Sequence, residues 1–175
     1  MPNDQYDFAS WKMAMAILAT MRGVPCMYYG TEILMTGNKD NGHGFIREDF
    51  PGGWEGDERS AFTPEGRTVN EQEAYSYVQK LLLWRKKNMA VQKGEFKHFI
   101  PENKTYVYFR YTESSCVMVA LNHDTHALKA LSMDKYKECT KGFTFGKNVI
   151  TGENVNYMDA VTIPPRSALI IEFKK

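Results

Sequence analysis

Apolar residues near the start of the chain recur at the spacing of a buried helix. From residue 7 to residue 22 they fall three and four positions apart, and small or apolar side chains fill the remaining faces. Gly23 ends this segment, and residues 24–29 form an uninterrupted apolar run, which is the pattern of a strand buried on both faces. A second helix is predicted over 70–88, with Asn70 as its N-cap, acidic residues in its first turn and basic residues in its last. The pattern therefore predicts a helix, a buried strand and a helix in succession.

The segment that follows the predicted strand has a different composition. Residues 37–53 are rich in glycine and in polar side chains, and are too polar and too flexible for a core element. A strand that ends in a long polar loop is how an α/β barrel builds a binding surface at the carboxyl ends of its strands. We therefore expect binding residues in this loop.

The chain after residue 88 consists of short β-like runs separated by turn residues. Residues 105–111 alternate, with Tyr106, Tyr108 and Arg110 on one face, and residues 116–121 form a more continuous apolar strand. Further strands are predicted over 127–131, 148–151, 154–157, 161–163 and 168–173. About seven or eight strands in this length suit a two-sheet Greek-key sandwich. We therefore expect one domain over residues 1–91 and an all-β domain over 92–175.

Three segments carry a resemblance to a known family. GVPCMYYGTEI at 23–33 and IREDFPGGW at 46–54 resemble the eighth barrel strand and its loop in the α-amylase family of glycoside hydrolases, most closely its neopullulanase and cyclomaltodextrinase members. VTIPPRSALIIEF at 161–173 is similar to the closing strand of that family's C-terminal domain. The resemblance implies an α+β fragment that contains the last αβα elements of a (β/α)8 TIM barrel, followed by an all-β Greek-key sandwich C-terminal domain.

Charge and composition limit the classes of partner. With 22 basic and 21 acidic residues the net charge is +1, so there is no general electrostatic reason to expect nucleic acid or an anionic membrane as a partner. No apolar run approaches the ~18 residues of a membrane helix. The cysteines Cys26, Cys116 and Cys139 are too widely spaced for a metal site, and we expect all three to be buried thiols.

The resemblance also bears on catalysis. Hydrolysis of a glycosidic bond with retention needs one carboxylate as nucleophile and a second carboxyl group as acid and base. In the α-amylase family these groups, and a further aspartate, lie on barrel strands four, five and seven. The resemblance therefore implies that all three precede residue 1, and we expect no catalytic residue in this chain.

Several polar residues have the types found in catalytic or metal sites, but their positions in the sequence argue against these roles. Asn122, His123 and Asp124 spell the Asn-His-Asp motif of strand seven, but they follow a strand of the β-rich half, so we interpret them as a turn held by side-chain bonds to the backbone. His123 and His126 lack a third ligand in view, which argues against a metal site. Glu32 follows the predicted barrel strand, but it lacks the second carboxylate that catalysis requires.

Sugar-binding groups are the candidates that remain. Sugars are held by aromatic platforms and by planar hydrogen-bonding side chains. In family members the loop after strand eight carries an Asp and an Arg that bind a glucose unit, and the resemblance makes Arg47 the candidate arginine and Asp40 the candidate aspartate. Trp54 is the candidate platform. The alternative is that Arg47 pairs with Glu48 or Asp49 to stiffen the loop.

The resemblance implies that the parent protein is a hydrolase of α-glucans such as maltodextrin, cyclodextrin or pullulan, and that this chain alone is inactive. Two alternatives concern the sandwich: an independent carbohydrate-binding module, for which Tyr106 and Tyr108 would form an exposed aromatic row, or a purely structural domain. The expected partners are an α-glucan oligosaccharide, the missing N-terminal barrel portion, and a second copy of the chain through self-association of residues 8–84. No cofactor is expected in this chain, with calcium left to the full-length parent. The sequence leaves open whether that parent is periplasmic or cytoplasmic.

Overall fold

The structure, a computed structural model, describes residues 8–157 and 159–174. The α-helices in this part of the chain are α1 (Phe8–Thr20), α2 (Val69–Arg85), α3 (Met89–Lys93) and α4 (Lys137–Thr140). The strands are β1 (Glu95–His98), β2 (Thr105–Tyr111), β3 (Cys116–Asn122), β4 (Lys129–Ser132), β5 (Phe145–Asn148), β6 (Ala160–Ile163) and β7 (Ser167–Lys174). Short 3-10 turns are η1 (Thr31–Ile33), η2 (Lys39–Asn41), η3 (His43–Ile46), η4 (Pro64–Gly66) and η5 (Met133–Tyr136). None of these helices is long and apolar enough to cross a membrane.

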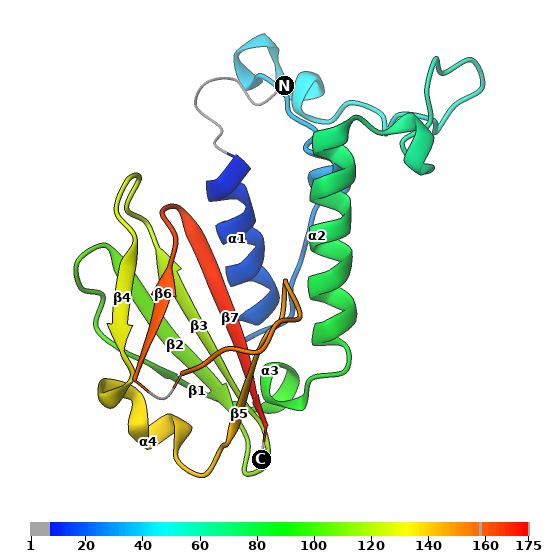
Figure 1. Cartoon of the computed structure of the whole chain (residues 1–175). Coiled ribbons are helices and arrows are strands. Elements are labelled where there is room, and N and C mark those ends of the chain that lie inside the picture. The colour runs from blue at the N-terminus through cyan, green and yellow to red at the C-terminus, as the bar shows by residue number, and fades with distance from the viewer. Residues whose placement is uncertain (1–7, 158, 175) are drawn as a thin grey trace. The chain divides into compact units, whose positions relative to one another are not determined.

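The strands form two antiparallel sheets (Figure 1). The larger sheet has the order β1-β2-β3-β7-β5, and β4 pairs with β6 in the smaller one. Strand β3 pairs along its whole length with both β2 and β7, and every one of its residues is buried. The core between the sheets is formed by side chains from both, among them Val107, Phe109, Met118, Val161, Ile163, Ile171 and Phe173. The predicted alternation of residues 105–111 is confirmed, because Val107 and Phe109 enter this core while Tyr108 and Arg110 face the other side.

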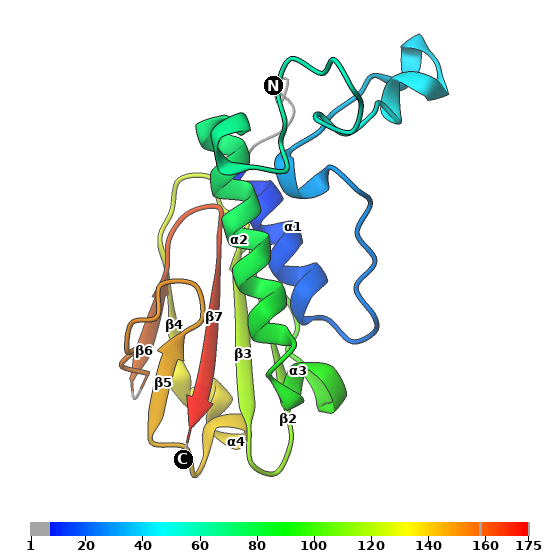
Figure 2. The ribbon, with the colours of Figure 1, turned by 90° about the vertical axis from the view of Figure 1, so that its right-hand side faces the viewer.

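The described chain divides into two compact units. The loop unit comprises Cys26–Gln79, and the sheet unit comprises Phe8–Pro25 and residues 80–174. In the sheet unit α1 lies on one face of the larger sheet, with β4 and β6 on the other (Figure 2). In the described chain α1 and residues 80–85 of α2 belong to the sheet unit. The predicted domains 1–91 and 92–175 stay a prediction.

Small residues let α1 approach the sheet closely. Ala16 and Ala19 are almost fully buried, and the Thr20 hydroxyl donates to the Ala16 carbonyl and lies 2.6 Å from the Tyr108 hydroxyl on β2. Trp11 is also buried. Ala14, however, is exposed. The helix is thus not buried on all sides, although its composition suggested that it would be. Its predicted start, Asp7, lies outside the described residues.

The ends of α2 differ from the prediction. Thr68 rather than Asn70 caps it: the Glu71 amide donates to the Thr68 hydroxyl at 3.3 Å, and the Thr68 amide donates to the Glu71 carboxylate at 2.8 Å. This reciprocal pair is a capping box, which satisfies two backbone groups where a single cap would satisfy one. The helix also ends at Arg85 instead of residue 88, because Asn88 accepts a bond from the Val91 amide and caps α3.

The predicted buried strand over residues 24–29 is wrong. These residues form no strand, and Val24, Tyr28 and Tyr29 are 92%, 56% and 45% exposed. An apolar run becomes a buried strand only where neighbouring strands pair with it, and no described strand does so here. The same exposure reaches Cys26, so only Cys116 of the predicted buried thiols is fully buried, and Cys139 is half-buried.

The end of the sheet unit also differs in detail. In place of strands over 148–151 and 154–157, the structure has β5, a turn, and a single bridge between Lys147 and Asn154. Asn148 explains the turn, because its side-chain oxygen accepts bonds from the amides of Ile150 and Thr151. A side chain that satisfies these amides competes with extended pairing.

Candidate functional site

Arg47, the strongest binding candidate of the sequence, lines a small pocket in the loop unit. The pocket has a volume of about 80 Å³ and is formed mainly by three short stretches, residues 28–31, 35–37 and 46–48. Gly37 permits this arrangement, since a Cβ at this position would lie 1.9 Å from the Phe45 carbonyl oxygen. The close approach brings residues 46–48 against residues 35–37.

Two adjacent tyrosines form the aromatic wall of this pocket. The ring centroids of Tyr28 and Tyr29 lie 4.5 Å apart, and the Tyr29 hydroxyl donates to the Glu48 carbonyl at 3.0 Å. A side-chain hydrogen bond with Tyr28 raises the pKa of Tyr29, and the nearby charge of Asp49 adds to this effect. Tyr29 therefore remains a neutral hydrogen-bonding group at neutral pH.

The guanidinium of Arg47 has no carboxylate partner in the described part of the chain. Neither Glu48 nor Asp49 forms an ion pair with it, although both follow it directly. The suggested role of stiffening the loop through such a pair is therefore not seen. Its hydrogen-bond donors remain open to a ligand.

Asp40 and Trp54 do not line the same pocket as Arg47. Asp40 is exposed in η2, where its amide donates to the Asn38 side chain. Trp54 is 67% exposed in a turn that Asp57 holds by accepting bonds from the amides of Gly52 and Trp54. Of the three predicted residues, only Arg47 therefore lines this pocket.

Arg67 and Arg59 fasten this loop to the first turns of α2. Arg67 donates to the carbonyls of Ala61 and Phe62 and to the Gln72 side chain, and it lies 3.6 Å from the ring centroid of Tyr75. Arg59 forms a two-pronged bond with Glu71 at 2.7 and 2.9 Å. The turn that carries Trp54 is thereby tied to a regular helix.

The Asn-His-Asp sequence is confirmed as a turn with bonds from side chains to the backbone. The Asn122 amide group donates to the carbonyls of Ala127, Ile163 and Pro164. Asp124 accepts from the amides of His126 and Ala127 and pairs with Lys129 at 3.2 Å. These two backbone bonds and the lysine hold the pKa of Asp124 well below its usual range.

The pKa shifts do not support acid catalysis by Glu71 or Asp124, because the pKa of each carboxyl group is lowered. Burial raises the pKa of Glu71, but the bonds from Arg59 and Thr68 outweigh it and the net change is a lowering. A general acid in glycoside hydrolysis needs a raised pKa. Glu32 lies in η1, and its Oε2 atom is buried without a hydrogen-bond partner among the described residues.

The described residues contain no group of three or more His, Cys, Asp or Glu side chains that could hold a metal ion. His123 and His126 are both exposed at the turn after β3. Sequence reasoning named neither Tyr28 nor Tyr29 as a binding residue. The signal was present, because two adjacent aromatic residues directly precede the glycine that opens the loop.

Residues 96–172 match the family model of the cyclo-malto-dextrinase C-terminal domain. The matches support a C-terminal domain of the α-amylase family. A cyclomaltodextrin glucanotransferase of Geobacillus stearothermophilus is 32% identical over 156 residues, which cover 84% of this chain and 19% of that protein. An α-amylase of Niallia circulans is 32% identical over 111 residues, which cover 63% of this chain and 18% of that protein. The chain thus spans about a fifth of the length of these relatives.

Solved structures show the same fold. An α-amylase from Geobacillus thermoleovorans, in complex with acarbose, superposes with a TM-score of 0.71 at 19% identity, and the match covers 98% of this chain and 35% of that one. A mixed α/β structure with an antiparallel sheet is therefore shared with amylases of this family. The barrel elements that the sequence predicted for residues 1–91 stay a prediction.

Proposed function

We propose that this chain is the C-terminal part of an α-amylase-family hydrolase that acts on α-glucans such as maltodextrin, cyclodextrin or pullulan, with a specificity like that of neopullulanase. The observation that carries the proposal is the similarity to cyclomaltodextrin glucanotransferases, because it extends over most of the chain rather than over the sheets alone. The match of residues 96–172 to the cyclo-malto-dextrinase C-terminal domain supports it.

In this proposal the loop unit contacts the glucan through the pocket of Arg47. A volume of about 80 Å³ corresponds to about two or three water molecules, so it accommodates a hydroxyl-bearing edge of a sugar rather than a whole ring. Arg47 supplies donors without a competing carboxylate, and Tyr28 and Tyr29 supply apolar surface and hydroxyl groups. Asp40 and the exposed ring of Trp54 would contact more distant units of the same oligosaccharide.

The sheet unit has a structural role in this proposal. The alternative of a carbohydrate-binding sandwich required an exposed row of Tyr106 and Tyr108, and Tyr108 is fully buried beside Thr20 of α1. Only the half-buried Tyr106 remains of that row. Catalysis, and any calcium ion, belong to the rest of the longer protein.

Titration of the 175-residue chain with maltotriose tests the proposal. We expect no release of reducing sugar above background, and a change in tryptophan fluorescence that Trp54→Phe removes and Trp84→Phe keeps. Arg47→Ala should weaken binding about tenfold, because it removes a charged hydrogen bond. Lys39→Ala removes one nearby exposed charge outside the pocket and should leave the affinity unchanged.

Two results would contradict the proposal. Equal affinity of the wild-type chain and Arg47→Ala would remove the loop from glucan binding. Release of reducing sugar that Asp124→Asn abolishes would make the turn after β3 a catalytic site and would overturn its structural interpretation.

A further inference from the structure

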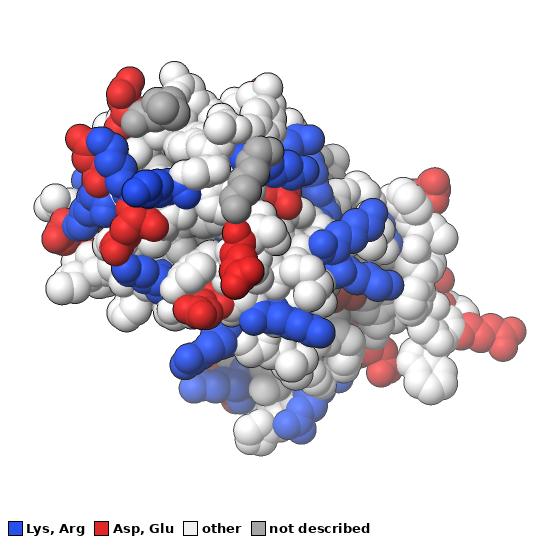
Figure 3. Space-filling model, turned by 90° about the horizontal axis from the view of Figure 1, so that it is seen from below, with Lys and Arg blue, Asp and Glu red and all other residues white. Residues whose placement is uncertain are grey.

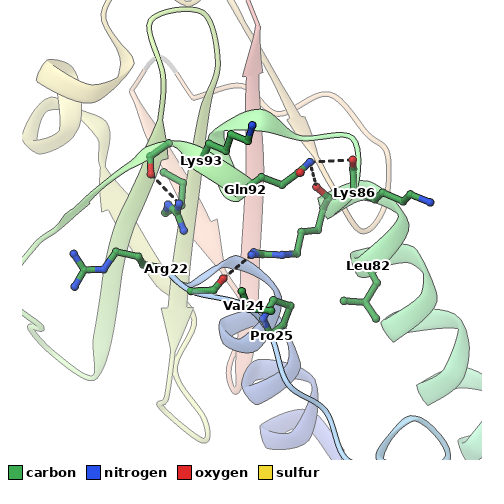
Figure 4. Close-up of a pocket in the computed structure, with 11 residues that line it drawn as sticks. Arg22, Val24, Pro25, Leu82, Lys86, Gln92 and Lys93 are labelled. Carbon is green, nitrogen blue, oxygen red and sulfur yellow. Dashed lines mark hydrogen bonds between the residues drawn. The ribbon is translucent and has the colours of Figure 1, made fainter.

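A second and larger hollow lies within the sheet unit. It has a volume of about 710 Å³ and is bounded by the segment after α1, the end of α2, α3 and one residue of β2 (Figure 4). Its basic lining residues are Arg22, Arg85, Lys86, Lys93 and Arg110, and none of the lining residues that the structure describes is acidic. The face in Figure 3 carries both basic and acidic side chains.

The first of two buried arginines at this hollow is Arg85, which is 9% exposed. It donates to the Ala19 carbonyl at 2.7 Å and to the Gly23 carbonyl at 2.8 Å, and thus binds the last carbonyls of α1 and the chain just after it. These acceptors are neutral. No carboxylate in the described part of the chain pairs with Arg85, and burial lowers the pKa of its guanidinium.

The second buried arginine, Arg110, is 2% exposed. Among the described residues it also donates only to carbonyls, those of Thr20 at 3.3 Å, Gly94 at 2.8 Å and Glu95 at 3.3 Å. Burial lowers the pKa of Arg110, and the positive charge of Arg85 lowers it further. The hollow therefore holds two buried positive charges that repel each other and have no counterion among the described residues.

Hydrogen-bond donors remain available around these charges. A guanidinium has five N–H donors, of which Arg85 uses two and Arg110 uses three in bonds to other described residues. Arg22, Lys86 and Lys93 are exposed at the rim, and none of them pairs with a described carboxylate. In Figure 4 the side chains of Arg22 and Lys86 extend to opposite sides. If they turned toward the buried arginines, neither would break an ion pair with a described carboxylate.

We propose that this hollow binds an oxyanion, a carboxylate or phosphate group, between its two buried arginines and its three basic rim residues. A planar guanidinium fork matches the geometry of carboxylate and phosphate oxygens, and bonds between ionised partners are about twice as strong as neutral ones. An anion would also offset the cost of burying two like charges. The site is independent of the glucan pocket, because the two share no residue.

Thermal unfolding of the 175-residue chain in inorganic phosphate tests this site. At a phosphate concentration of about ten times Kd, the melting temperature should rise by about 3 to 6 °C over sodium chloride of equal ionic strength. The triple variant Arg22→Gln, Lys86→Gln, Lys93→Gln should lose this rise. The buried arginines stay intact in this variant, so the carbonyls of α1 keep their donors.

The control is the triple variant Lys39→Gln, Lys87→Gln, Lys141→Gln, which removes three positive charges outside the hollow and should keep the full rise. A rise with acetate alone identifies a carboxylate as the natural ligand, whereas a rise with phosphate alone identifies a phosphate group. As a second readout on the wild-type chain, phosphate should shift the amide resonances of Gln92 and Gly94. No rise above chloride, or equal rises in both triple variants, would overturn the proposal.

Discussion

Asn122 fixes the turn after β3 through bonds that a single side chain makes to three backbone carbonyls. It is fully buried, and its oxygen also accepts a bond from the Asp124 amide. Two of the carbonyls, those of Ile163 and Pro164, belong to the end of β6 and the residue after it. One side chain therefore connects the larger sheet to the smaller one.

We expect Asn122→Ala to lower the free energy of unfolding by about 2 to 4 kcal/mol, because it leaves buried carbonyls without a donor. His123→Ala is the matched control, since the neighbouring side chain is exposed and should change the stability by no more than about 0.5 kcal/mol. Urea unfolding monitored by circular dichroism measures both. Equal midpoints for the two variants would show that the turn does not depend on Asn122.

At the level of residues, the sequence predicts the role of a side chain whose contacts lie close to it along the chain. The role of Asn122 and Asp124 as turn residues was predictable because most of their bonds reach only a few positions along the chain. The burial of Tyr108 was not, since it depends on Thr20 in a helix 88 positions away. The same limit applies to Arg47, because its pocket needs Tyr28 and Tyr29 from a segment that the pattern assigned to a strand.

At the level of elements, α1 ends where two arginines donate hydrogen bonds to its last carbonyls. Arg85 binds the carbonyls of Ala19 and Gly23, and Arg110 binds that of Thr20. The last carbonyls of a helix have no partner within it, and a cation near them is also favoured by the helix dipole. Basic side chains from α2 and β2 thus perform the capping that the sequence of α1 does not provide.

Arg85→Met should therefore loosen the end of α1. The substitution keeps much of the apolar stem but removes both donors, and we expect a loss of about 2 to 4 kcal/mol in unfolding free energy. The Met21 amide, which donates to the Ile17 carbonyl, should exchange faster with solvent. Lys86→Met is the control, because Lys86 is exposed and donates to no carbonyl of α1. Unchanged exchange at Met21 in Arg85→Met would mean that α1 ends without this cap.

The pattern of the sequence predicted most elements but not how they associate. Periodicity found α1, α2 and three strands of the larger sheet, β2, β3 and β7, but it missed β1 and β5 of the same sheet. It assigned a strand to residues 24–29 because apolar content alone does not reveal whether pairing partners exist. The family resemblance, not the periodicity, assigned α1 to a barrel, and that assignment stays a prediction; in the structure the helix packs against β7 within the sheet unit.

At the level of the whole molecule, the apolar surface that needs a partner is smaller than the sequence suggested. Self-association was expected through residues 8–84, but α1 already buries Trp11 in the sheet unit. The exposed apolar residues of the loop unit are Tyr28, Tyr29, Phe45, Ile46, Trp54, Phe62 and Val69. Each large apolar side chain left in water forgoes ~1.5 to 3 kcal/mol of burial. Together they make a sum comparable to the ~5 to 15 kcal/mol stability of a domain.

We therefore predict that the chain self-associates through its loop unit, and that light scattering at low micromolar concentration detects species larger than a monomer. Ile46→Ser with Val69→Ser should shift the distribution toward monomer, because both side chains are exposed in the loop unit. Ile100→Ser with Leu128→Ser is the matched control: these side chains are 80% and 58% exposed in the sheet unit, and their loss should leave the distribution unchanged. A monodisperse wild-type monomer would refute self-association, and an equal effect of both double variants would show that the contact is not confined to the loop unit.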